Sequence, residues 1–295
     1  MLGRVSSAER SSERLAERRR LRRRRIAFAF GILFLIILGA IVYGLWQNSV
    51  RISRVQIFGP PSLGSFGGAS ADTSLADIAR QTMIGSYLGI IPRDSIFFFP
   101  EGHIRADILV AHPEIAAVSI FRNGFTGLSI KTDNRVPVAR WCGSGMEKSD
   151  FRATSSKSDF LAPECYLFDA KGFIYMATNT AIGSSTPLNS FMVYESFAHE
   201  SSPVGSTLPN ATDLPSVFDF ARQLSTLGSP VISISFRNDE VDDYLASGTR
   251  ITYVLGDEQN AFTALVSARA NLNLADGSLD YVDVRFDGKV YSKKK

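Results

Sequence analysis

Histidines, serines and glycine-rich runs are the groups in this sequence whose types could support catalysis or bind phosphate. His103 and His112 lie nine residues apart and His199 stands alone, so none has a Cys, Glu or second His at a metal-ligand spacing. The serines lie outside any Gly-x-Ser-x-Gly element. The glycine runs at 64–68 and 248–256 lack the Gly-Lys-Ser/Thr ending of a phosphate-binding loop. We therefore expect a binding protein and not an enzyme, with no catalytic residues, metal, cofactor or small-molecule substrate.

One acidic cluster could bind a cation, because carboxylates are ligands that hard cations prefer. It consists of Asp239, Glu240, Asp242 and Asp243. The run "VISISF" before it and the run "VDDYLASG", which contains Asp242 and Asp243, are typical of strands, so the cluster would fall around a turn between them. We expect a solvated turn here.

The basic residues are concentrated near the beginning of the sequence. Residues 1–25 contain ten arginines and three glutamates, so they carry a net charge of +7 while the whole chain carries +3. Residues 26–46 follow directly and contain no charged side chain. As an α-helix this stretch would be roughly 30 Å long, the thickness of the hydrocarbon core of a bilayer. We expect a basic cytoplasmic tail and then a transmembrane helix.

The arginines beside the apolar stretch indicate its orientation. Four of them adjoin it: Arg22, Arg23, Arg24 and Arg25. The positive-inside rule places this cluster in the cytoplasm and everything after Trp46 outside. A cleaved signal peptide is the alternative, but the run exceeds the ~7–15 residues of a signal core and lacks a small-x-small cleavage site.

The same tail could bind anionic lipid, since each arginine near such a surface contributes about 1 kcal/mol. Residues 26–295 carry a net charge of −4, because the tail holds +7 of a total of +3. The basic character therefore belongs to a tail beside a membrane span, and we do not expect nucleic acid as a partner.

Two cysteines, Cys142 and Cys165, lie in the segment expected outside the cell. An oxidising compartment permits a disulfide between them, and closing a loop of this length would stabilise the fold by roughly 3 kcal/mol. Two unpaired thiols are the alternative, and they would be exposed to oxidation.

Residues 50–135 are predicted to form a compact unit with the order β-α-α-β-β. Alternating apolar residues at 50–59 indicate a strand, and residues 74–83 and 101–113 have helical spacing and helix-ending signals. The run "GSYLGIIPRDSIFFFP" between the helices is expected to be an ordered loop. "RNGF" at 122–125 then indicates a hairpin between two strands.

Residues 136–291 consist mostly of short apolar runs typical of strands. Two stretches interrupt them with helical spacing, at 213–228 and 258–272. We expect an α+β fold: the membrane helix, the β-α-α-β-β unit, and a mostly antiparallel β domain with two helices, ending in a basic tail at 292–295.

Several stretches, in this order, resemble the FtsQ/DivIB family of bacterial cell-division proteins. "ISRVQIFG" is similar to the opening strand of that family's POTRA domain, and "HPEIAAVSIFRNGFTGLSIKTDNRVPVARW" to its closing hairpin. "CYLFDAKGFIY" and "YVDVRFDGKV" resemble the start and the close of its β domain. The loop at 60–72 and the insertion between the cysteines look longer than usual, Asn134 stands where an acidic residue is commoner, and the turn "FDGKV" is tighter.

The resemblance implies a non-catalytic scaffold of the division septum. Such a protein is anchored in the cell membrane by one helix, with its N-terminus in the cytoplasm and its POTRA and β domains outside. It binds single-span partners of the FtsB/FtsL type, which add a strand to the edge formed by its C-terminal strand.

On this chain the resemblance places the partner-binding residues in the last strand. They are Tyr281, Asp283, Arg285, Phe286, Gly288, Lys289 and Val290. Val282, Val284, Phe286 and Val290 would share the face toward the core. The alternative is that this strand is central and completes the sheet, with Phe286 as part of the core.

Two other functions stay open. The chain could be a POTRA-containing component of another envelope assembly or secretion complex, although such proteins usually carry several POTRA repeats or a β-barrel. A membrane-anchored cell-wall enzyme would need a catalytic Ser/Lys, Cys/His or metal set, which the sequence does not suggest.

Overall fold

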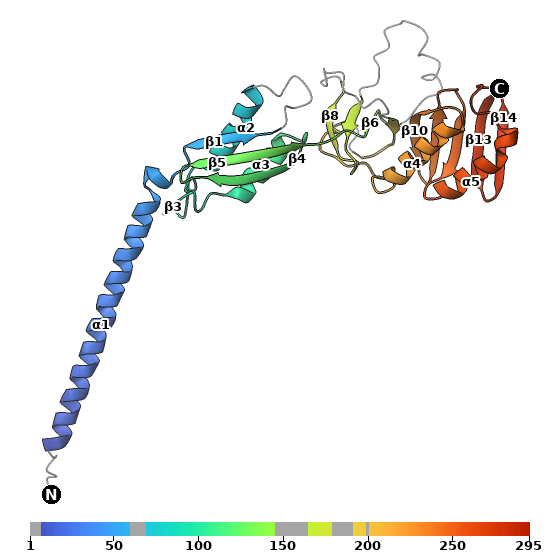
Figure 1. Ribbon diagram of the computed structural model, residues 1–295. Coiled ribbons are helices and arrows are strands. Elements are labelled where there is room, and N and C mark those ends of the chain that lie inside the picture. Colours follow the sequence, from blue (N-terminus) through green and yellow to red (C-terminus); the bar gives the residue numbers. More distant parts are fainter. Residues whose placement is uncertain (1–6, 60–68, 145–164, 179–190, 199–200) are drawn as a thin grey trace. The chain divides into compact units, whose positions relative to one another are not determined.

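The computed structural model describes residues 7–59, 69–144, 165–178, 191–198 and 201–295 (Figure 1). His199 and the glycine run at 64–68 lie outside these ranges. The chain divides into two compact units. One contains 1–56, 76–104 and 120–130, and the other contains 57–75, 105–119 and 131–295.

The first described element is a long helix, α1 (Ser7–Leu45). Its segment Arg25–Leu45 has a mean hydropathy of 2.8 and is long and apolar enough to cross a membrane. At ~1.5 Å per residue these 21 residues are about 32 Å long, close to the thickness of a bilayer core. The apolar side chains along this segment are exposed up to Ile41. The predicted apolar helix is therefore present, and a short 3-10 turn, η1 (Asn48–Val50), follows it.

The next elements follow the predicted order β-α-α-β-β. They are β1 (Arg54–Phe58), α2 (Ala69–Thr82), α3 (Glu101–Ala111), β4 (Ile115–Asn123) and β5 (Gly127–Asn134). The three strands form a sheet of order β1-β5-β4. Between the helices, the segment expected to be a loop contains a two-stranded hairpin, β2 (Ser86–Tyr87) and β3 (Ile91–Pro92).

The second half of the chain forms a nine-stranded sheet. Its strands are β6 (Ala139–Trp141), β7 (Tyr166–Phe168), β8 (Ile174–Ala177), β9 (Met192–Tyr194), β10 (Val231–Arg237), β11 (Glu240–Leu245), β12 (Arg250–Val254), β13 (Leu279–Phe286) and β14 (Lys289–Lys294). Their order is β14-β13-β12-β11-β10-β9-β6-β7-β8. Five neighbouring pairs are antiparallel and three are parallel, so the predicted mostly antiparallel sheet is confirmed.

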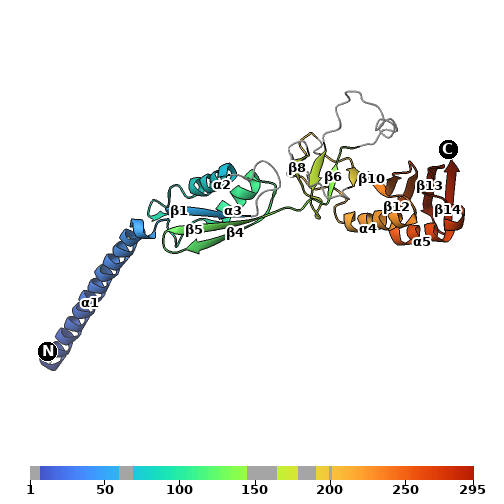
Figure 2. The ribbon, with the colours of Figure 1, turned by 45° about the horizontal axis from the view of Figure 1, so that its top comes forward.

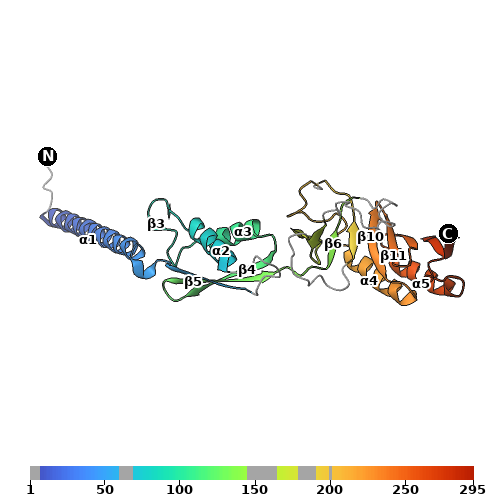
Figure 3. The same ribbon diagram turned by 90° about the horizontal axis from the view of Figure 1, so that it is seen from above.

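The two predicted helices make two of the three parallel pairings possible. Parallel neighbours need a crossover connection, and α4 (Leu214–Leu224) connects β9 to β10 while α5 (Glu258–Ala268) connects β12 to β13. Figures 2 and 3 show both helices along the same side of this sheet. Phe220 of α4 packs on Tyr253 of β12, with ring centroids 4.4 Å apart, and on Phe262 of α5. The main core therefore lies between these helices and the sheet.

A disulfide joins Cys142, just after β6, to Cys165, just before β7, with Sγ atoms 2.04 Å apart. This is the pairing that the oxidising-compartment argument favoured. β6 and β7 are antiparallel neighbours, so the bond connects these two strands at one end of the pair. The residues between the cysteines from 145 to 164 lie outside the described ranges.

Candidate partner-binding edge of the C-terminal sheet

The last described segment is a hairpin and not one strand. β13 ends at Phe286, the chain turns at Asp287 and Gly288, and β14 returns antiparallel from Lys289 to Lys294. Gly288 has φ +64°, a conformation that glycine adopts without strain. The prediction of one continuous strand across this stretch was wrong because an Asp-Gly pair favours a tight reversal. Residues 292–294, expected to belong to a basic tail, therefore continue the sheet.

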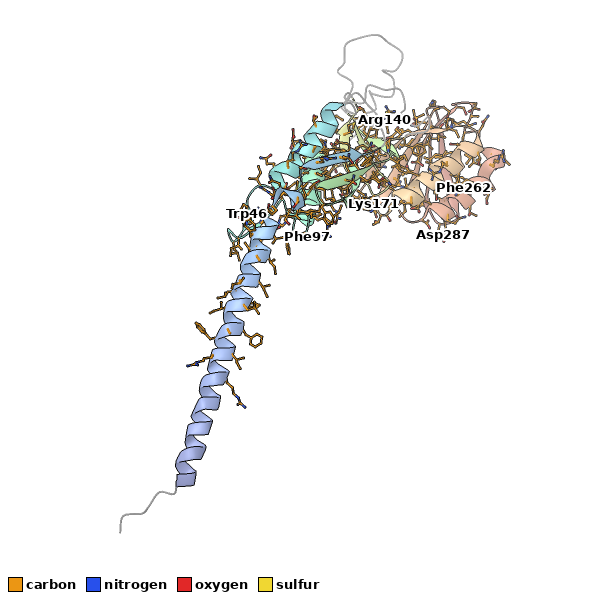
Figure 4. All side chains as sticks on the ribbon, turned by 60° about the vertical axis from the view of Figure 1, so that its left-hand side comes forward. Trp46, Phe97, Arg140, Lys171, Phe262 and Asp287 are labelled. Carbon is orange, nitrogen blue, oxygen red and sulfur yellow. A yellow bond between two sulfur atoms is a disulfide. The ribbon has the colours of Figure 1, made fainter. Side chains whose placement is uncertain are left out.

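Among the described residues, β14 is one of the two edge strands of the sheet, because its only neighbour in the strand order is β13. Figures 1 and 2 show it at the end of the sheet, beside the C-terminus, and Figure 4 labels Asp287 in the turn that precedes it. A strand at an edge has one row of backbone N–H and C=O groups that no neighbouring strand pairs. β14 therefore has the main-chain groups that an added strand would need.

The backbone groups of β14 that point away from β13 can be identified from one hydrogen bond. Lys295 N–H donates to the carbonyl of Ser278 at 3.0 Å, so the backbone of Lys295 points toward β13. Along a regular strand, the backbone N–H and C=O groups of successive residues point alternately to one neighbouring strand and to the other. Both register shifts of this pair place their extra residue on β13, so β14 keeps this alternation throughout. The outward-pointing backbone groups therefore belong to Val290, Ser292 and Lys294.

The side chains of β14 divide between the core and solvent. Val290 is partly buried against the core beneath the sheet. Tyr291 is half exposed on the opposite face, and its ring meets that of Phe286 edge-on with centroids 5.4 Å apart. Lys293 reaches Asp280, with Nζ and Oδ2 3.3 Å apart. Val290 therefore packs β14 against the core. The face of β14 that points to solvent is basic and aromatic.

An ion-pair network ties β13 to the strands behind it. Arg285 contacts both Asp283, at 2.6 Å, and the carboxylate of Glu240 on β11. The hydrogen bonds from Arg285 lower the pKa of Asp283, with burial acting in the opposite direction. Asp283 and Arg285 thus pair with each other within the sheet. These two side chains fix the position of the β13–β14 hairpin. A partner could reach them only from the face of the sheet that α4 and α5 do not cover.

The seven residues expected to bind a partner are separated by the hairpin. Tyr281, Asp283, Arg285 and Phe286 lie on β13, whose neighbours are β12 and β14. Gly288 lies in the turn, and Lys289 and Val290 lie on the edge strand. Phe286 is 51% exposed, which contradicts the alternative that made it part of the core.

Sequence reasoning left Tyr291 and Ser292 out of the binding set and assigned 292–295 to a basic tail. The two-residue Asp287-Gly288 turn, with Val290 and Tyr291 shortly after it, was the pattern that could have identified this strand.

The acidic cluster differs from the solvated turn that we expected. Asp242 and Asp243 are 1% and 0% exposed on β11, and among these four residues only Asp239 lies outside that strand. Asp242 forms an ion pair with Arg237, with 2.7 Å between Nε and Oδ2, and accepts a hydrogen bond from the hydroxyl of Thr252 at 2.6 Å. Neither carboxylate oxygen of Asp243 has a hydrogen-bond partner among the described residues. Burial raises the pKa of Asp243 well above its ordinary value, with Asp242 and Glu258 adding to the effect.

Within the described ranges, no group of three or more His, Cys, Asp or Glu side chains is arranged to hold a metal ion. No family model matches the chain, and no curated protein matches it. A functional interpretation must therefore come from the edge, the apolar helix and the residues around them.

Proposed function

We propose that this protein is a non-catalytic scaffold of the bacterial division septum that binds single-span partners of the FtsB/FtsL type by strand addition to β14. The observation that supports the proposal best is the edge position of β14, with outward backbone groups at Val290, Ser292 and Lys294. The ordered resemblance of the sequence to the FtsQ/DivIB family supplies the biological setting.

Strand addition suits the chemistry of this edge. In this mode the main-chain hydrogen bonds give affinity, and side chains at alternate positions give specificity. Outward groups two residues apart are about 6.8 Å apart along β14, the repeat that an added strand also has. Lys289, Lys293 and Lys294 are exposed on this strand. A partner strand with acidic residues would therefore be favoured, and the lysines would discourage edge-to-edge aggregation while no partner is bound.

The anchor of the proposed scaffold is the apolar part of α1. The basic tail before it would lie in the cytoplasm against anionic lipid, and both sheets would lie outside the cell membrane. The partners are then membrane proteins with one span each, whose outer segments reach the same side. POTRA architecture at 50–135, binding without catalysis or cofactor, and enrichment at the septum all belong to this proposal.

A truncation after Tyr291 tests strand addition. Deleting all of 279–295 would be a poor test, because it would remove the buried side chains of Leu279, Val282 and Val284 with the edge. Removing Ser292–Lys295 leaves β13 and Val290 in place. We expect the truncated full-length protein to insert in the membrane but to capture FtsB/FtsL-type partners poorly. Equal capture by the truncated and complete chains would refute the proposed edge.

Charge reversal at the edge has a matched control in the same sheet. Lys293→Glu changes β14, whereas Lys171→Glu makes the same change in the exposed turn between β7 and β8, near the opposite end of the strand order (Figure 4). Partner capture should fall only for Lys293→Glu. A fluorescent fusion in dividing cells tests the septum: a diffuse envelope distribution, or capture of proteins from another envelope assembly, would contradict the division role.

A further inference from the structure

Residues 84–98 contain the β2–β3 hairpin, and we call this segment the juxtamembrane hairpin. Its outer surface is apolar. Several large apolar side chains there are exposed: Ile84, Leu88, Ile90, Phe97 and Phe98. No charged residue occurs from Ile84 to Ile90, or from Ser95 to Phe98. Contiguous exposed apolar surface usually marks a site where another molecule or a membrane binds.

The juxtamembrane hairpin is attached to the end of the apolar helix. Trp46 Nε1–H, one residue past α1, donates to the carbonyl of Ile90 at 2.8 Å. Leu45, in the last turn of α1, is only 9% exposed, and β3 contacts α1. The hairpin therefore lies beside the last turn of the apolar segment and not far above it.

A second connection holds the other end of the hairpin near the helix. Ile52 N–H donates to the carbonyl of Asp94 at 2.8 Å, and Ile96 N–H donates to the carbonyl of Val50 at 3.0 Å. Phe97 and Phe98 follow these paired residues directly. Figure 4 shows Phe97 and Trp46 on the side of the molecule where α1 ends. Both apolar stretches of the hairpin are thus fixed close to the end of the span.

The nearby arginines pair with a carboxylate or lie over an aromatic ring, which lowers the cost of bringing this surface to a membrane. The guanidinium of Arg51 pairs with the carboxylate of Asp94 at 2.6 Å. Arg93 lies over the ring of Tyr87, with Cζ 5.2 Å from the ring centroid. Such paired or ring-stacked arginines are suited to the boundary between lipid and water.

Leu88, at the tip, is difficult to explain by the folding of the protein alone. Its side chain is 96% exposed, and its φ is +52°, a conformation in which glycine or asparagine is preferred. A leucine here gains nothing from the core and is unfavourable for the backbone. It would gain from an apolar environment outside the protein.

We propose that the juxtamembrane hairpin inserts Leu88, Ile90 and neighbouring apolar side chains into the interfacial layer of the lipid bilayer that α1 crosses. The helix ends where this layer begins, and the layer extends roughly 5–8 Å beyond the hydrocarbon core on each side. The hairpin thereby fixes the tilt of the first compact unit against the membrane surface. This inference rests on α1 spanning a membrane and is independent of partner binding at β14.

The test uses the full chain in vesicles of phosphatidylcholine and phosphatidylglycerol, with a fluorophore on a single added cysteine. Leu88→Cys carries the fluorophore at the tip, and the two native cysteines are occupied by their disulfide. Val110→Cys is the matched control, an 81% exposed apolar residue near the end of α3, roughly 14 Å along that helix from its start. Both side chains are exposed, so neither change should disturb folding.

We expect the fluorophore at position 88 to have blue-shifted emission, strong quenching by nitroxide-labelled lipids and several-fold weaker quenching by iodide than the fluorophore at 110. Equal iodide quenching at both sites without nitroxide quenching would overturn the proposal. Protection from iodide that depends on protein concentration, again without nitroxide quenching, would show self-association and would also overturn it. Partner capture through β14 serves as a separate readout and should be unchanged in both variants.

Discussion

Replacing Ser292 by proline tests the proposed edge at the level of one backbone group. Proline has no N–H, and the N–H of Ser292 points away from β13 by the alternation set at Lys295. The β13–β14 ladder should therefore remain intact, since proline is tolerated on the outer side of an edge strand. The variant should fold normally but offer one donor fewer to an added strand.

The expected loss of affinity follows from the partner's backbone carbonyl that would lose the N–H of Ser292 as its hydrogen-bond donor. A buried acceptor left without a hydrogen bond costs about 1–3 kcal/mol. At about 1.4 kcal/mol per tenfold change, the dissociation constant for the partner should rise about 5- to 140-fold. Ser292→Ala keeps the N–H and removes only the hydroxyl, so its affinity should stay close to that of the unchanged protein.

The assay is a binding titration of the full chain in lipid nanodiscs with an FtsB/FtsL-type partner, beside a thermal unfolding curve for each variant. Lys293→Pro provides the contrast, because its N–H points toward β13 and its loss should lower the unfolding temperature. The reasoning would be refuted if Ser292→Pro bound as tightly as Ser292→Ala. It would also be refuted if the two proline variants were equally destabilised, because the inward and outward rows would then be wrongly assigned.

Two buried carboxyl groups predict how stability depends on pH. Burial raises the pKa of Glu195, 3% exposed, to about 7, with a hydrogen bond from Asn210 acting against it. Protonation therefore stabilises the fold fully below about pH 4.5, and this contribution is lost as pH rises to about 7. At about 1.4 kcal/mol per pH unit the loss reaches up to about 3 kcal/mol, which Glu195→Gln should abolish in urea unfolding between pH 4 and pH 8. For Asp243→Asn, whose parent carboxyl has a pKa raised by burial, we expect at neutral pH an unfolding free energy equal to or above that of the unchanged protein. A clear loss there would mean that a charged Asp243 has a partner.

Much of the fold follows from local patterns in the sequence. The uncharged run of 26–46 predicted the apolar part of α1. Helical spacing predicted α4 and α5, with an ending glycine as a further signal for α4. These patterns are strong because each element buries or exposes a whole face over several turns. The β-α-α-β-β order also followed from alternation and from turn residues.

The position of each strand in the sheet could not be obtained in this way. An alternating run such as 279–286 shows that one face is buried, but it does not show which strands lie on either side. Here β13 pairs with β12 only because α5 carries the chain across the sheet. The binding edge was therefore assigned one strand too early, and Asp287-Gly288 was treated as a detail of one strand instead of a reversal.

Buried carboxyl groups were missed for a related reason. Asp242 and Asp243 belong to a run of acidic residues, which usually indicates solvent exposure. Their burial depends on how β11 is placed between two other strands, where Asp242 contacts Arg237 on β10 and Arg250 and Thr252 on β12. No local pattern contains that information.

The strand order also has a consequence for biosynthesis. In a chain delivered across a membrane from its N-terminal end, β10, β11 and β12 are available before α5, β13 and β14. Until then the growing sheet ends at β12, whose Ile251 and Tyr253 are fully buried once the sheet is complete. The lysine-bearing edge appears only once β14 has been delivered, so strand addition there would select chains in which every described strand of this sheet is in place. Chains that still lack β13 and β14 would instead expose the apolar side chains of β12, and exposed apolar surface is what chaperones and proteases recognise.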